Sequence, residues 1–257
     1  MQGATEFLPV SSSGHLVLAE RVLGFRRPGL ALETGLHLGT LVAVILAYPG
    51  DVGGLFGGLG DLFRRRGGRR VETVLVLLAA SLPAAMAGIL LGDLVDRLFG
   101  SLVAVAIGWC VAGSALIASR RLPPGRRRLG DLGARDALLI GAVQALALVP
   151  GVSRSGATIV AGQWRGLAAD EAARFSFLLS LPTVAGAVLL QALPLWRGGG
   201  GVGFGLWVGL PVAALAGFAA IRFCLRRLRG PGGLAPFGWY CLVLGALCLL
   251  RTSLSGG

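Results

Sequence analysis

The sequence predicts an all-α fold: a polytopic transmembrane helical bundle with two inverted-topology repeats, each containing a re-entrant broken helix. Three observations lead there: long apolar runs, arginine clusters between the runs, and two similar Ser/Gly-rich interruptions. The 257 residues are 54% hydrophobic and 14% charged, with a mean hydropathy of +0.77. Because an average soluble domain carries about a quarter charged residues, this composition excludes a soluble protein.

Five apolar runs approach the ~20 residues that cross a hydrocarbon layer about 30 Å thick. A sixth run, Leu36–Tyr48, is shorter and reaches that length only if Thr34 and Gly35 join it. The five longer runs are Val71–Leu91, Ser101–Ser119, Phe175–Trp196, Gly203–Phe223 and Pro236–Leu250. We therefore expect one integral membrane domain over residues 1–257.

The net charge of +12 comes from arginine, because the sequence contains no lysine. Arginines at the ends of apolar runs are typical of loops that face the cytoplasm and its anionic lipids, so we expect membrane-lipid contacts and no nucleic acid. Three loops are strongly basic: Arg64–Arg70, Arg120–Arg135 and Arg226–Arg229. The positive-inside rule places these loops in the cytoplasm, and the less basic Gly92–Gly100 and Gly198–Gly203 outside.

This topology leaves two stretches that enter and leave on one side. Residues 1–33 carry the interruption LPVSSSG and residues 136–170 carry PGVSRSG. Broken segments that enter from opposite faces are typical of inverted repeats, here about 1–119 and 136–252, and the breaks must be buried in protein or line a wet cavity. One constant shift pairs Gln2 with Gln144, Ser11 with Ser153, Ser13 with Ser155, and Gly14 with Gly156. The alternative is chance similarity of two Ser/Gly loops.

The first constellation is QGATEFLPVSSSGH. Glu6 follows Gln2 by one helical turn, and a carboxylate in an apolar region indicates a function by default. Pro9 ends the helix, and Gly14 and His15 follow the serines. The hydroxyls are those of Ser11, Ser12 and Ser13. The alternative interpretation is a serine-capped helix start.

The second constellation is PGVSRSGAT, in which Arg154 lies in an otherwise uncharged stretch. Its guanidinium suits phosphate oxygens and keeps its charge, and amides at a helix start also favour an anion. The neighbouring small polar residues are Ser153, Ser155, Gly156 and Thr158. The alternative is an arginine that pairs with Glu6 for structure alone.

Together the two constellations suit phosphoryl transfer. Arginine and amides hold the phosphate, a hydroxyl or water attacks, histidine moves a proton, and the carboxylate holds a metal or the base. The spacing alone leaves the individual roles open. His37, at the start of an apolar run, is interpreted as a packed or interfacial histidine.

QGATEFLPVSSSGHL followed by PGVSRSGAT resembles the paired signature of the undecaprenyl-diphosphate phosphatase family, the BacA or UppP type of bacitracin resistance protein. The resemblance covers nearly the whole chain and includes EAARFSFLLSLP. It implies a multi-pass enzyme of the bacterial cytoplasmic membrane with two inverted re-entrant repeats. Such an enzyme converts undecaprenyl diphosphate to undecaprenyl phosphate for peptidoglycan synthesis, with Mg²⁺ or Ca²⁺ as the cofactor.

The resemblance also implies roles for single residues. Glu6 is a catalytic residue needed for metal-dependent hydrolysis and a tentative metal ligand, and Arg154 with the serines binds the diphosphate. The nucleophile is Ser12 or His15, with Ser12 favoured. The expected substrate-binding residues are Gln2, Ser11, Ser13, Gly14, Ser153, Ser155, Gly156 and Thr158. Gln2 stands where many members carry Glu, which removes one candidate metal ligand. A polyprenyl diphosphate lipid and a homodimer are the expected partners.

The rival hypothesis is a transporter that binds an anion or a lipid phosphate with the same broken helices. A transporter needs the arginine pocket but no nucleophile. A third possibility, a non-catalytic membrane scaffold, leaves Glu6 and Arg154 without a purpose.

Overall fold

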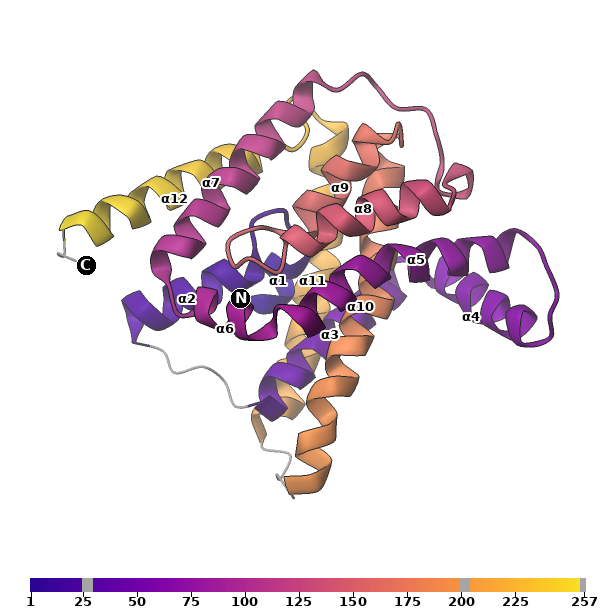
Figure 1. Ribbon diagram of the computed structural model, residues 1–257, viewed down its shortest axis with the longest axis horizontal. Helices are drawn as coiled ribbons and strands as arrows, with labels where there is room; N and C mark the ends of the chain where they lie inside the picture. The colour runs from indigo at the N-terminus through magenta and orange to yellow at the C-terminus, as the bar shows by residue number, and fades with distance from the viewer. Residues whose placement is uncertain (25–29, 199–203, 255–257) are drawn as a thin grey trace.

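A computed structural model describes residues 1–24, 30–198 and 204–254 (Figure 1). Within these ranges the chain forms α-helices and two 3₁₀ turns, and none of the described residues forms a strand. The all-helical prediction is therefore confirmed. The elements are α1 (Gln2–Phe7), α2 (Ser12–Leu23), α3 (Leu30–Ala47), α4 (Pro49–Phe63), α5 (Arg69–Leu90), α6 (Gly92–Phe99), α7 (Leu102–Ala118), η1 (Ser119–Arg121), η2 (Leu129–Asp131), α8 (Ala134–Leu146), α9 (Arg154–Trp164), α10 (Ala169–Gly198), α11 (Phe204–Arg229) and α12 (Ala235–Leu254).

Five described helices are long and apolar enough to cross a membrane. A sixth candidate joins Leu32–Ala47 to Pro49–Phe63 through a bend of 101°. Pro49 opens α4 at a position where its missing N–H costs no helical hydrogen bond. The five single spans are Arg69–Leu90, Leu102–Arg121, Ala169–Leu189, Gly205–Arg229 and Ala235–Leu254. The multi-pass prediction is confirmed, with one span for each of the five long apolar runs.

The long helices pack in pairs that join distant parts of the chain. Figure 1 shows α12 beside α7, α5 beside α8, and α3 near α11 and α10. At the crossing of α7 and α12, a Cβ on Gly113 would lie 2.7 Å from the carbonyl oxygen of Gly238. Only glycine permits two backbones to approach so closely, which is a common way to pack helices in membranes.

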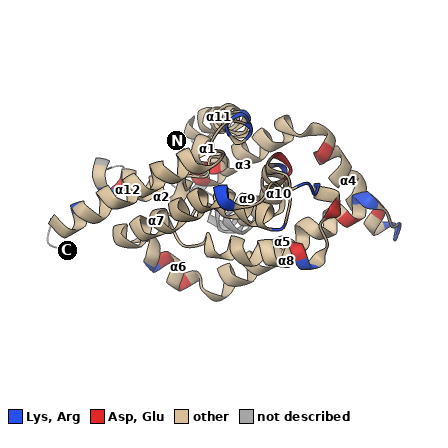
Figure 2. Ribbon diagram, turned by 90° about the horizontal axis from the view of Figure 1, so that it is seen from above, with Lys and Arg blue, Asp and Glu red and all other residues tan. Residues whose placement is uncertain are grey.

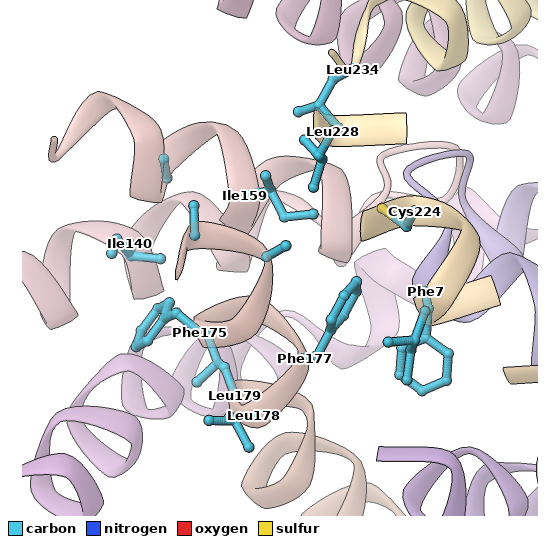
Figure 3. Close-up of a cluster of buried hydrophobic side chains, with 14 of the residues drawn as sticks. Phe7, Ile140, Ile159, Phe175, Phe177, Leu178, Leu179, Cys224, Leu228 and Leu234 are labelled. Carbon is cyan, nitrogen blue, oxygen red and sulfur yellow. The ribbon is translucent and has the colours of Figure 1, made fainter. Parts of the chain in front are cut away.

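The core lies around α10, whose residues Phe175, Phe177, Leu178 and Leu179 are almost fully buried (Figure 3). The ring of Phe7 meets that of Phe177 edge to face at 5.6 Å between centroids. This contact fixes the last residue of α1 against the central helix. The start of the first break therefore has a rigid support.

The three arginine-rich loops lie near one another around the start of α10. The backbone N–H of Leu129 donates to Glu171 at 2.8 Å, and Arg229 lies 3.8 Å from Asp170. A Cβ on Gly130 would lie 3.9 Å from Cδ of Arg69, which connects the first two loops. Figure 2 shows charged residues gathered at the tip of α4 and near α8, whereas α7 and α12 are almost free of them. This clustering agrees with the expectation that the three loops share one side.

Three expectations for the connecting segments need correction. The predicted loop Gly92–Gly100 contains a helix, α6, and the predicted loop Arg226–Arg229 is the last turn of α11. The apolar pattern does not predict helix α4, because its six glycines lower the helix propensity. The predicted loop Gly198–Gly203 lies, apart from Gly198, outside the described residues.

Candidate active site

The first break separates α1 from α2 at the predicted place. Leu8 turns the chain to an extended conformation, Pro9 follows, and α2 begins after Ser11. Ser11 has φ 67°, a left-handed conformation that costs a non-glycine residue about 1–2 kcal/mol. Such strain is typical of functional segments that their surroundings hold in place.

The surroundings also satisfy the exposed backbone of this break. Three successive carbonyl oxygens accept hydrogen bonds from three different elements. Leu8 accepts from Ser155 Oγ at 3.1 Å, Pro9 from Cys241 Sγ at 3.7 Å, and Val10 from Trp109 Nε1 at 2.9 Å. Because unpaired carbonyls are costly in an apolar interior, these bonds make a non-helical segment tolerable there.

The second break separates α8 from α9 and passes through Gly151, which has φ +93°. A Cβ on Gly151 would lie 2.1 Å from the carbonyl oxygen of Val105 in α7, so the chain needs glycine there. A Cβ on Gly14 would lie 3.2 Å from the Cα of Gly151. The two breaks therefore lie against each other as well as against α7.

The two helices that follow the breaks begin in the same way. Ser11 Oγ accepts a hydrogen bond from the N–H of Gly14, and Ser153 Oγ accepts one from the N–H of Gly156, both at 3.2 Å. These bonds confirm that Ser11 and Ser153 are helix caps. Each cap also lies 3.2 Å, Oγ to Oγ, from the serine two residues later. The first residue of α2 is Ser12, and the first residue of α9 is Arg154.

Those two first positions meet at one carboxylate. Ser12 Oγ donates to Oε2 of Glu6 at 2.7 Å, and Arg154 Nη2 donates to Oε1 at 3.0 Å. The side chains of Glu6 and Arg154 are 10% and 18% exposed. Burial makes the charge pairing strong, and the guanidinium keeps a small exposed part. The structure thus joins three of the four predicted catalytic residues.

His15, the fourth predicted catalytic residue, has other partners. Its Nδ1 lies 2.7 Å from the carbonyl oxygen of Ser11, and its Nε2 lies 2.7 Å from the hydroxyl of Tyr240. Because a carbonyl only accepts, the neutral ring carries its proton on Nδ1, and Nε2 accepts from Tyr240. The rings of His15 and Tyr240 also stack at 5.7 Å between centroids. His15 is therefore held between the first break and α12, and the described contacts do not bring it to Glu6 or Arg154.

Gln2 lies one turn before Glu6 and is buried. Its Nε2 lies 3.2 Å from both ring nitrogens of His37 in α3. Its Oε1 is buried and has no hydrogen-bond partner among the described residues. Gln144 in α8, which the constant sequence shift pairs with Gln2, also has a buried Oε1 without a partner among the described residues. Buried polar atoms usually have partners, so an unpartnered oxygen near the site offers one ligand atom.

The other predicted substrate-binding residues surround the breaks. Ser155 is bonded to Leu8, and Thr158 lies 2.6 Å from Ser176, Oγ1 to Oγ, behind Arg154. Gly156 lies against Pro9, because a Cβ on Gly156 would lie 3.2 Å from Cβ of Pro9. Ser13 contacts Ser11. Their roles in substrate binding stay predictions.

Three residues of the site carry little signal in the sequence. Tyr240 and Trp109 lie inside apolar runs, where an aromatic residue is ordinary, and only the fold brings them to the first break. His37, expected to be a packed or interfacial histidine, is the partner of Gln2. Its place at the start of the sixth apolar run gives no hint of that contact.

Comparisons with known proteins point in one direction. The family model described as "Bacitracin resistance protein BacA" matches residues 1–247. A protein named undecaprenyl-diphosphatase from Trichlorobacter lovleyi is 40% identical over 260 residues, covering 99% of this chain and 95% of its own. Proteins of the same name from Alcanivorax borkumensis and Geobacter sulfurreducens are 41% and 40% identical, each covering 97% of this chain and 94% of its own.

Proposed function

Because the chain belongs to the BacA family of bacitracin resistance proteins, we propose that it hydrolyses undecaprenyl diphosphate to undecaprenyl phosphate and inorganic phosphate. It is a multi-pass hydrolase of the bacterial cytoplasmic membrane. Its product is the lipid carrier that peptidoglycan synthesis reuses, and its activity accounts for bacitracin resistance. The observation that carries the proposal is the contact of Ser12 and Arg154 with the two oxygens of the Glu6 carboxylate.

The arrangement favours Ser12 as the nucleophile over His15, whose two ring nitrogens are both engaged. Ser12 Oγ attacks the terminal phosphorus while the bridging P–O bond breaks, and undecaprenyl phosphate leaves. The Ser12 proton passes to Glu6, which already accepts its hydrogen bond. Water then attacks the phosphoserine, which releases inorganic phosphate and restores the hydroxyl.

Arg154 stabilises the negative charge of the phosphoryl group. The bond to Glu6 uses one of the five N–H groups of the guanidinium, and the others suit phosphate oxygens. The amides at the starts of α2 and α9 add positive partial charge at the same place. Fixed donors in a site with little water are typical of electrostatic catalysis.

The donor set fits a divalent cation shared with the substrate. Among the described residues no group of three His, Cys, Asp or Glu side chains could hold a metal. Mg²⁺ is usually held by one or two carboxylates together with substrate phosphates, which Glu6 and a diphosphate supply. The unpartnered Oε1 of Gln2 is a third candidate oxygen. A bound cation supplies positive charge that neutralises the diphosphate.

The proposal includes the finer topology: the two broken segments are re-entrant and belong to inverted repeats, about 1–119 and 136–252. The matching serine caps and the matching unpartnered glutamines support a duplicated unit. Cysteines introduced at Ser13 and Arg128 in intact cells would test the topology by their accessibility to an impermeant reagent. A homodimer and specific membrane lipids complete the proposed partners, and mass measurement of the purified protein would test the dimer.

Phosphate release from undecaprenyl diphosphate by the purified protein tests the activity. We expect one phosphate per substrate molecule and a loss of at least about a hundredfold in rate for Ser12→Ala and for Arg154→Ala. Ser253→Ala and Arg226→Ala are matched controls outside the site. No release by the unaltered protein, or normal release by both site variants, contradicts the proposal. Either result would favour the rival hypothesis of a transporter for an anion or a lipid phosphate. A transporter does not need the hydrogen bond between Ser12 and Glu6.

A further inference from the structure

A cavity with many charged lining residues lies apart from the candidate active site, between α4, α5, η2 and the start of α10. Its volume is about 470 Å³, within the range of small-ligand pockets. None of its lining residues belongs to the Glu6 and Arg154 constellation. It lies among the arginine-rich loops, where Figure 2 shows charged residues at the tip of α4 and beside it.

One arginine of this cavity is neutralised. Arg174 Nε donates to Asp51 at 2.9 Å, its Nη2 contacts the same carboxylate, and its Nη1 donates to Glu171 at 3.1 Å. Glu171 also accepts from the N–H of Leu129. These bonds connect α4, α10 and η2, so they form a structural floor for the cavity.

Three further arginines line the cavity: Arg69, Arg70 and Arg128. Within the described ranges none of them forms an ion pair with a carboxylate. Two are placed by packing, because Cδ of Arg69 lies against Gly130 and Nη1 of Arg70 lies against Gly57. Asp131 also lines the cavity, so the lining carries four arginines and three carboxylates. The cavity therefore has a formal net charge of +1, with three arginine side chains outside any ion pair among the described residues.

The backbone adds to this charge. Helix α5 begins at Arg69, and no side chain caps its start. The first N–H groups of this 22-residue helix are therefore not capped by a side chain, and they carry a positive partial charge. They lie at Arg69 and Arg70, which line the cavity. Gly50 and Gly54 on the facing helix leave open space, since a Cβ on either would meet nothing within 4 Å.

The outer face of α4 is apolar. Phe56 is 69% exposed and Phe63 is 86% exposed, on the helix whose other residues line the cavity. Exposed phenylalanines beside a basic pocket match the two parts of a phospholipid, its acyl chains and its phosphate. A soluble anion would make no use of them.

We propose that this cavity binds the phosphate headgroup of an anionic phospholipid, with Arg69, Arg70 and Arg128 as its ligands. Guanidinium groups bind phosphate oxygens as bidentate forks, which explains arginine at these positions. The lipid's chains lie along Phe56 and Phe63. The site is independent of the proposed catalytic reaction, which uses none of these residues.

Lipid binding to the purified full chain in detergent tests the proposal, with dioleoylphosphatidylglycerol as the probe. We expect bound phosphatidylglycerol by native mass spectrometry, far less phosphatidylcholine, and no displacement by 10 mM inorganic phosphate, roughly the concentration range of weak sites. Each arginine replaced by glutamine should weaken binding about fivefold, so Arg69→Gln with Arg128→Gln should weaken it about twenty-fivefold. Arg66→Gln, an exposed arginine of the same loop that does not line the cavity, is the matched control.

Phosphate release by the double variant checks that it is folded, and we expect it to be unchanged in detergent. Equal binding of phosphatidylcholine and phosphatidylglycerol would overturn the proposal. So would full binding by the double variant, or the same loss in Arg66→Gln. Displacement of the lipid by inorganic phosphate would assign the cavity to a free anion and overturn the lipid assignment. If the double variant has lost its fold, Phe56→Gln is the second test, with an expected loss of lipid affinity.

Discussion

The guanidinium of Arg154 lies 3.0 Å from the carboxylate of Glu6, although 148 residues separate them in the chain. Each residue belongs to a different broken helix, and the two breaks pack directly against each other. The fold thus brings a carboxylate and a guanidinium together where two helices are broken. A ligand can contact both charged groups at this place. The activity proposed for this protein depends on that contact.

Removal of one member of the pair should destabilise the protein. Arg154→Ala leaves the Glu6 carboxylate with Ser12 but without its counter-charge, and we expect a loss of about 3 kcal/mol. Glu6→Gln together with Arg154→Gln should lose less, because neither charge stays buried alone. Thermal unfolding in detergent measures both. A double variant less stable than Arg154→Ala would contradict the coupling.

Tyr240→Phe tests the support of His15. It removes the hydrogen bond at 2.7 Å but keeps the stacked ring, so we expect about 1 kcal/mol of lost stability. If His15 moves a proton, the rate of phosphate release falls and its pH profile shifts. Tyr48→Phe is the control, because the Tyr48 hydroxyl is buried without a partner among the described residues. Equal effects of the two changes would show that His15 needs no such support.

Gly151→Ala should disrupt the second break. Alanine at φ +93° is strained, and its Cβ would lie 2.1 Å from the carbonyl oxygen of Val105. We expect at least about 2 kcal/mol of lost stability, measured by thermal unfolding. Gly60→Ala in α4 has open space around it and should be neutral or stabilising by up to about 1 kcal/mol. A stable Gly151→Ala protein would mean that the break is not packed as described.

Asp136, in the first turn of α8, connects this helix to the basic loop before it. Burial raises the pKa of Asp136, but hydrogen bonds from Arg127 and Arg165 outweigh burial and bring the pKa down to about 2. A lowered pKa gives stability that is present above the ordinary value and is lost only as the pH falls toward 2. Asp136→Asn should therefore lower the unfolding temperature equally at pH 6 and pH 8. A loss that appears at only one of these pH values would contradict this assignment.

The broken helices and the chemistry of the site could be predicted from the sequence, because Pro9, Gly151 and the serines have strong local preferences. The sequence also indicates Glu6 and Arg154, since isolated charges in apolar stretches are rare. Local preference fails at α4, where glycines form a helix that packs on α5, and at α6, a short surface helix. Tertiary contacts decide such segments.

The partners of the site residues could not be predicted for the same reason. Tyr240 reaches His15 from 225 residues away, and no local pattern marks it. His37 meets Gln2 only because α1 and α3 pack together. The cavity lined by arginines at the starts of α5 and η2 likewise depends on two loops that the fold brings to the start of α10. The pattern of charges predicts that those loops lie on the same side of the membrane, but it does not predict that they contact one another.

A double-mutant cycle on phosphate release tests the central claim most directly. The rates of Glu6→Gln, Arg154→Gln and the double variant are compared with that of the unaltered protein, with undecaprenyl diphosphate as substrate. If the two side chains act as one unit, the double variant is about as slow as the slower single variant, with a coupling of at least about 2 kcal/mol. Losses that simply multiply would mean that the two residues act independently, and the account of the site would be wrong.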